Sequence, residues 1–104
     1  MHIITFSKIK KFTRYHHNAE SSLNSWYHIV SKTNYQDFNE LRQTFPSADQ
    51  VARCTVFNIG GNNIRLIAAI HYNRKKIYIR QILTHAEYSK NTWKNECKKR
   101  SNKK

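Results

Sequence analysis

With 104 residues, of which 38% are apolar and thirteen are Phe, Tyr or Trp, the chain can build one small core but not two domains. Its two glycines and one proline exclude a low-complexity or disordered chain. The formal net charge is +13 and is unevenly distributed: residues 1–50 carry six Lys or Arg against four Asp or Glu, whereas residues 51–104 carry thirteen against two. This excess predicts a polyanionic partner, or an acidic protein that covers the charge.

The first half of the chain predicts a short strand over residues 1–6 and then three helices. The first helix is capped by Ser7 and ends before the HHN run at 16–18, the second spans about 19–31, and the third about 38–44. Asp37 and Glu40 have the spacing of a capping box at the start of the third helix. Pro46 ends that helix, and residues 47–50 are expected to form a connection.

From residue 53 the apolar period changes from helical to two, which predicts an antiparallel meander. Its expected strands are 54–59, 64–72 and 76–83, with a tight hairpin loop at 60–63 and a turn at 73–75. A strand, then helices, then a meander predict an α+β domain in which the helices cover one face of an antiparallel sheet. We assign this domain to residues 1–93 and a basic C-terminal tail to 94–104, where the last helix frays into disorder.

Closing the hairpin loop so that Asn58 lies opposite Arg65 divides the sheet into two faces. One face is nearly all apolar and should receive the helices: Phe57, Ile59, Ile64, Leu66, Ala68, Ile70, Ile77, Ile79 and Leu83. The other face carries the polar side chains: Asn58, Arg65, Ile67, Ala69, His71, Tyr78, Arg80 and Ile82. This division holds only if the turn at 73–75 keeps the side chains of the last strand on the same alternating faces.

Thr84 and Glu87 form a second capping-box spacing, which starts a last helix with His85 and Tyr88 on one side of its first turn. Unpaired amides at a helix N-terminus attract anions. We therefore expect Arg65, Arg80, His85 and Tyr88 to surround one phosphate. Taken singly, each has a simpler explanation, namely a solvated arginine, a polar first-turn residue or a packed aromatic ring.

The two cysteines, Cys54 and Cys97, predict no shared site. One lies in an expected strand and the other in the lysine-rich end, and they lack a CxxC spacing, so the sequence favours neither a disulfide nor a zinc site. No basic N-terminal segment precedes a long apolar run, and no apolar run has the length of a membrane span. We expect a cytoplasmic protein that has no membrane partner.

These residues resemble the HigB-type toxins of bacterial type II toxin–antitoxin systems, within the RelE-like mRNA interferases. The resemblance is carried by residues 56–62 (VFNIGGN) leading to Arg65, by 78–80 (YIR) and by 83–88 (LTHAEY), with a looser match at 45–47 (FPS). It covers about half of the chain closely. The position after the tyrosine, commonly Asp in the family, is Ser89 here, so no catalytic role is carried over to it.

The resemblance implies a RelE-like α+β fold and an endoribonuclease that needs no metal or other cofactor. The implied substrate is mRNA in the A site of the ribosome, cut by attack of the ribose 2′-OH on the adjacent phosphate. It also implies neutralisation by a HigA-like antitoxin with a helix-turn-helix domain, in a complex that binds operator DNA. The basic tail would bind rRNA phosphates.

Such a reaction needs a base, charge stabilisation at the phosphate and an acid at the leaving oxygen. Arg65 and Arg80 would hold the phosphate, and His85 and Tyr88 would transfer protons or orient the 2′-OH, with the acid and base roles left open. Six further residues are expected to contact RNA: Asn58, His71, Tyr78, Arg74, Lys75 and Lys76.

Two other functions fit the same composition. A non-catalytic RNA- or DNA-binding module would use the arginines and aromatic rings to hold a backbone and stack bases. A protein-interaction domain would use its basic face only to bind an acidic partner. The combination of His85 and Tyr88 with two arginines favours the nuclease, because a binding module needs no proton-transfer group there.

Overall fold

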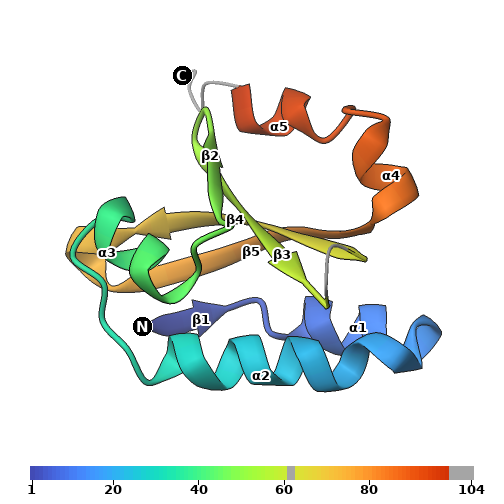
Figure 1. The fold of residues 1–104 in the computed structure, drawn as a ribbon, viewed down its shortest axis with the longest axis horizontal. Helices are drawn as coiled ribbons and strands as arrows, with labels where there is room; N and C mark the ends of the chain where they lie inside the picture. Colours follow the sequence, from blue (N-terminus) through green and yellow to red (C-terminus); the bar gives the residue numbers. More distant parts are fainter. Residues whose placement is uncertain (61–62, 99–104) are drawn as a thin grey trace.

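The computed structural model describes residues 1–60 and 63–98 and confirms the α+β class (Figure 1). Five strands form one sheet in the order β1-β5-β4-β3-β2. They are β1 (His2–Ile4), β2 (Asp49–Val51), β3 (Cys54–Ile59), β4 (Ile64–His71) and β5 (Lys76–Thr84). β1 runs parallel to β5 and the other neighbours are antiparallel, so the sheet is mixed. β2 overlaps residues 47–50, which were expected to form a connection without secondary structure.

The helices occupy both sides of this sheet (Figure 1). On one side lie α1 (Ser7–Tyr15), α2 (Glu20–Ser31) and α3 (Phe38–Thr44), and on the other α4 (His85–Ser89) and α5 (Lys94–Lys98). Two single 3₁₀ turns, η1 (His17–Ala19) and η2 (Tyr72–Arg74), complete the chain. Within the described ranges, none of the helices has the length and apolar character that crossing a membrane requires.

Local sequence signals set the starts of two helices. The Asp37 carboxylate accepts the backbone N–H of Glu40 at 2.9 Å and begins α3. At α4 both halves of the capping box are present: Thr84 Oγ1 accepts the N–H of Glu87 at 3.3 Å, and Glu87 Oε1 accepts the N–H of Thr84 at 2.9 Å. The cap predicted at Ser7 is wrong, because α1 begins at Ser7 itself, after Phe6, without a side-chain cap.

The main core lies between the sheet and α1, α2 and α3. Leu23, Trp26 and Val30 of α2 are fully buried there, as their helical spacing predicted. The ring of Phe57 from β3 meets Trp26 and Phe45 edge-on, with ring centroids 5.3 Å and 5.2 Å apart.

A β-bulge in β5 changes which side chains face which core. Ile67 lies opposite Gln81 and Ala68 opposite Ile79, so Arg80 is an additional residue in the ladder. One extra residue inverts the alternation beyond it. Ile82 therefore packs against the main core and Leu83 against the opposite side, the reverse of the prediction for these two residues.

A second, smaller core fills the space under the C-terminal helices. Its buried residues are Cys54, Val56, Ile67, Trp93 and Cys97, with Val51, Leu83 and Tyr88 packed against them. Cys54 and Cys97 form a disulfide, with their Cα atoms 5.4 Å apart. The prediction of no disulfide is therefore wrong: the partners are 43 residues apart, and only the return of α5 onto β3 brings them together.

The end of the chain also differs from the expected fraying helix. α4 ends at Ser89, and α5 is a separate helix whose Cys97 is buried against the sheet. The predicted boundary after residue 93 thus falls immediately before a packed helix. The rest of the expected tail, 99–104, and loop positions 61–62 lie outside the described residues.

Candidate active site

Arg65 and Tyr88, two of the four predicted catalytic residues, are in contact. The register places Arg65 of β4 between Asn58 of β3 and Leu83 of β5, as expected for the Asn58 pair. Its guanidinium carbon lies 4.9 Å from the centroid of the Tyr88 ring. Both side chains are half-buried, so the Tyr88 ring limits the positions of the guanidinium.

The Tyr88 ring is itself held by Trp93, a residue that the sequence analysis did not single out. The two rings stack with centroids 4.9 Å apart and planes at 16°, and the indole N–H of Trp93 donates to the carbonyl of Tyr88 at 2.9 Å. Trp93 is buried in the second core. Its position in a lysine-rich run could have indicated a buried anchor, because such a large apolar side chain is seldom left exposed.

His85 begins α4 at the same end of the sheet, because β4 and β5 pair Ile64 with Thr84 directly before it. Its side chain is exposed. Its backbone N–H donates to the carbonyl of Asn63 at 3.1 Å, and the N–H of Glu87 is bound by Thr84. Two of the first amides of α4 are thus already paired, so the positive charge at this end has to come mainly from side chains and not from the helix N-terminus.

Arg80 is exposed at the bulge of β5. It lies three residues before Leu83, the neighbour of Arg65, which is about 10 Å along a strand at 3.3 Å per residue. Its side chain borders two hollows, one shared with α1 and one shared with His71 and Cys97. The structure therefore places Arg80 beside the Arg65–Tyr88 contact and not inside it.

The other predicted RNA contacts form a second group at the opposite end of the β4–β5 hairpin. Arg74 ends η2, Lys75 has a left-handed backbone with φ 56°, and Lys76 begins β5. Beside them, the rings of His71 and Tyr78 meet edge-on at 5.2 Å. His71, at the end of β4, is six residues from Arg65, which separates this group from Arg65 by about 20 Å.

Lys75 has a structural role in that second group. Its ammonium donates to the carbonyl of Tyr35 at 3.4 Å, and its own carbonyl accepts the N–H of His2 at 2.8 Å. Asn58, by contrast, lies at the Arg65 end and is half-buried. Among residues 1–60 and 63–98, no group of three or more His, Cys, Asp or Glu could hold a metal ion.

Comparison with known proteins places these residues in a family. Residues 19–91 match the HigB toxin family, described as the RelE-like toxic component of a toxin–antitoxin system. The chain belongs to this family. The matched range includes Arg65, Arg80, His85 and Tyr88, and leaves α1 and α5 outside. The predicted resemblance to HigB toxins is therefore confirmed.

Individual HigB proteins align along most of this chain. The mRNA interferase HigB of Escherichia coli O6:H1 is 34% identical over 95 residues, which are 88% of this chain and 92% of the relative. The mRNA interferase toxin HigB of Escherichia coli K12 is 31% identical over 91 residues, 85% of this chain and 88% of the relative. The mRNA interferase HigB of Shigella flexneri has the same identity and coverage.

Proposed function

We propose that this protein is the toxin endoribonuclease of its toxin–antitoxin module and cuts mRNA by attack of a ribose 2′-OH on the adjacent phosphate. One observation carries the proposal: the guanidinium of Arg65 lies 4.9 Å from the Tyr88 ring, at the end of the sheet where His85 begins α4. An arginine and a tyrosine are thus in contact, and the short helix that carries the tyrosine also carries a histidine. The names of the similar proteins, mRNA interferases, support the same reaction.

In this mechanism the arginines stabilise charge and the ring residues handle protons. Arg65 and Arg80 neutralise the phosphate as negative charge develops on its oxygens. His85, whose side chain is exposed, exchanges a proton with the 2′-OH or with the leaving 5′ oxygen. Tyr88, fixed between Arg65 and Trp93, orients the ribose or carries out the other proton transfer, so that one group accepts the 2′-OH proton and the other donates a proton to the 5′ oxygen. The products are a 2′,3′-cyclic phosphate and a 5′-OH.

The proposal includes the partners of such a toxin. The substrate is mRNA bound in the A site of a translating ribosome, so the protein acts in the cytoplasm and contacts rRNA. A HigA-like helix-turn-helix antitoxin neutralises it, and the complex binds operator DNA. We further propose that the active site needs no metal ion, and we expect cleavage of ribosome-free RNA to be unchanged in EDTA.

Primer extension on a reporter mRNA, with and without translation, tests this function. Arg80→Ala and His85→Ala should each lower the cleavage rate about 100-fold or more, the range for loss of a proton-transfer or charge-stabilising group. His28→Ala is the matched control, since His28 is exposed on α2, on the other side of the sheet. Thermal unfolding should show that all three variants remain folded.

Two results would contradict the proposal. Full cleavage by both Arg80→Ala and His85→Ala would contradict the assignment of these two residues to the active site. No cleavage by the unaltered protein, in the presence or absence of ribosomes, together with tight RNA binding, would make the protein a non-catalytic binding module.

A further inference from the structure

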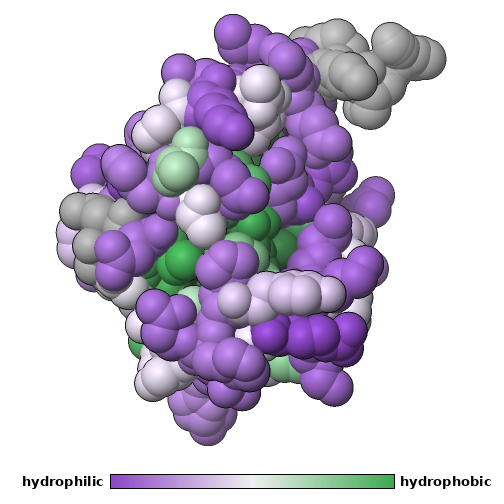
Figure 2. All heavy atoms as spheres, turned by 90° about the vertical axis from the view of Figure 1, so that its right-hand side faces the viewer, coloured by the Kyte–Doolittle hydropathy of each residue, from purple (hydrophilic) through white to green (hydrophobic). Residues whose placement is uncertain are grey.

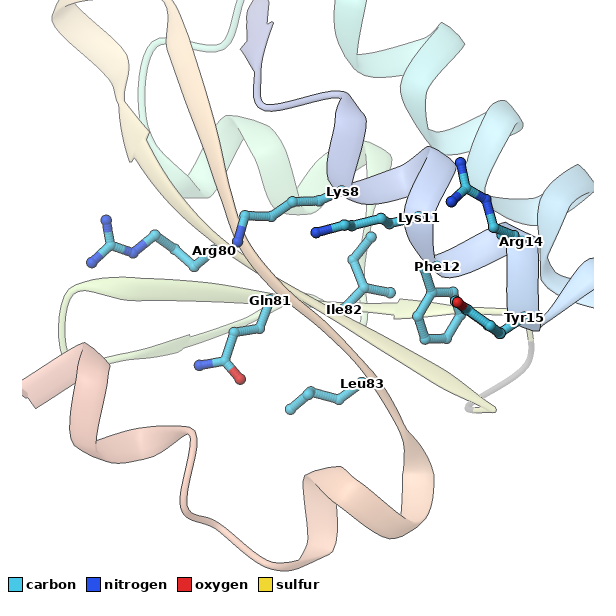
Figure 3. Close-up of a pocket in the computed structure, with 9 residues that line it drawn as sticks. All are labelled: Lys8, Lys11, Phe12, Arg14, Tyr15, Arg80, Gln81, Ile82 and Leu83. Carbon is cyan, nitrogen blue, oxygen red and sulfur yellow. The ribbon is translucent and has the colours of Figure 1, made fainter.

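A groove separates α1 from β5 and lies next to the candidate active site. Its volume is about 410 Å³. Phe12 of α1 and Ile82 and Leu83 of β5 line it with apolar atoms (Figure 3). Figure 2 shows this apolar surface at the bottom of a hollow between the polar surfaces of the C-terminal helices above and of α1 and α2 below.

Four cations border the groove. Lys8 and Lys11 of α1 extend over the groove toward β5, whereas the guanidinium groups of Arg14 and of Arg80, at the bulge of β5, point away from its apolar floor (Figure 3). All four side chains are exposed. No carboxylate is among the lining residues in the part of the chain that the structure describes. Cations that gather around an open groove without an acid raise the local positive potential and attract a polyanion.

The groove also has an aromatic ring on its rim. Tyr15 is 78% exposed, more than any other large hydrophobic side chain described. Phe12, half-buried at the floor, is backed by the ring of His16, with centroids 4.2 Å apart and planes at 9°. An exposed ring beside cations is the combination with which proteins hold single-stranded nucleic acid, because every base can stack on it.

The groove continues into the candidate active site. Leu83, at one end of the groove, is the register partner of Arg65, and Arg80, which lines the groove, lies beside the Arg65–Tyr88 contact. A strand whose phosphate lies at Arg65 and Tyr88 can therefore pass over Leu83 and Ile82 toward α1.

We propose that the α1–β5 groove binds the single-stranded RNA that flanks the cleaved bond, with Lys8 and Lys11 on backbone phosphates and Tyr15 stacked on a base. This subsite rests on the proposed nuclease function for its substrate. The basic residues of α1 looked like a solvated helix surface in the sequence. In the structure, Lys8, Lys11 and Tyr15 lie along one side of α1, and that side borders the groove.

The test uses a fluorescent single-stranded RNA of about 12 nucleotides whose riboses are all 2′-O-methylated, so that it binds without being cut. The groove variant is Lys8→Gln/Lys11→Gln. The matched control is Lys10→Gln/Lys32→Gln, which removes the same charge from exposed positions that do not line the groove. Fluorescence anisotropy over a series of salt concentrations gives the affinity and its salt dependence.

The groove variant should bind at least about tenfold more weakly at low salt. The slope of log K against log salt should fall by about 1.4, because each phosphate that is no longer neutralised lowers it by about 0.7. The control should bind less than about threefold more weakly, as expected from non-specific attraction alone. Tyr15→Ala should weaken binding about tenfold without changing the salt slope, because stacking releases no counterions.

The outcomes separate the groove from the nuclease function. Equal losses of affinity in the groove variant and the control would overturn the subsite, even if the protein cuts RNA. So would unchanged RNA binding accompanied by loss of binding to an acidic protein partner, which would make the groove a protein-docking site. If the unaltered protein cuts no RNA but binds the probe through the groove, the nuclease function fails, and the groove stands as an RNA-binding site that flanks no cleaved bond. If it cuts RNA, the groove variant should raise KM and leave kcat within about twofold.

Discussion

The two sides of the sheet are built very differently. The helix side buries a large set of apolar residues from three helices and four strands. Among the residues that the structure describes, the C-terminal side buries five and relies on the Cys54–Cys97 disulfide and the Trp93–Tyr88 stack. Small cores commonly need such covalent or aromatic reinforcement. Tyr88 and Arg65 lie on the C-terminal side. The candidate active site therefore depends on the packing of the short segment that contains α4 and α5, and not on the main core.

The largest loss of stability should come from removing the buried tryptophan on either side of the sheet. Trp93→Ala removes a buried indole, which typically costs about 3–5 kcal/mol. We expect α4 and α5 to lose their packing on the sheet, with Cys97 still bonded to Cys54, and RNA cleavage to be lost, while α1, α2 and α3 stay folded. Hydrogen exchange measured by mass spectrometry should then show fast exchange in α4 and α5 alone.

Trp26→Ala is the control on the helix side, where an equally buried indole is removed. Its cost should appear as global unfolding, with faster exchange in all the strands. If Trp93→Ala instead unfolds the whole protein, the two sides are one cooperative unit and the contrast is wrong.

The disulfide should have the next largest effect. Closing a loop of 43 residues stabilises the folded chain by about 3–4 kcal/mol in the chain-entropy estimate. Reduction of the bond to two thiols by excess dithiothreitol should lower the melting temperature and expose the second core to protease. Cys54→Ser/Cys97→Ser should melt at the temperature of the reduced protein and respond no further to dithiothreitol. A melting temperature unchanged by reduction would mean that packing alone holds α5.

The smallest effect should come from the cap of α4. Thr84→Ala removes the oxygen that accepts the N–H of Glu87, a loss of about 1 kcal/mol. We expect faster hydrogen exchange in α4, a several-fold lower cleavage rate and little change in global melting. Asp37→Ala removes the equivalent cap of α3 and should lower stability by a similar amount without affecting cleavage. Equal losses of cleavage in both would show that α4 has no special link to activity.

The sequence predicted those parts of the fold that depend on neighbours in the chain. Asp37 begins α3 and Thr84 begins α4 because capping is decided within four residues. The pairing of Asn58 with Arg65 follows from a short loop and regular alternation. For the same reason, Arg65 and the start of α4 were expected at one end of the sheet.

The parts that were missed depend on residues far apart. Nothing near Arg80 marks a bulge, because the extra residue is defined only by its pairing with β4. The disulfide depends on where α5 lies, which no local pattern states. The end of α4 did have a signal: Asn91, with φ 64°, is of a residue type that tolerates the left-handed position after a helix.

The disulfide has one more consequence, which concerns the connectivity of the chain. Cys54 and Cys97 close a covalent ring that contains Arg65, Arg80, His85 and Tyr88. A single cut in the polypeptide anywhere between the two cysteines therefore releases no fragment while the bond is intact. The two pieces of a nicked toxin stay joined, and the parts of the site separate only after the bond is reduced.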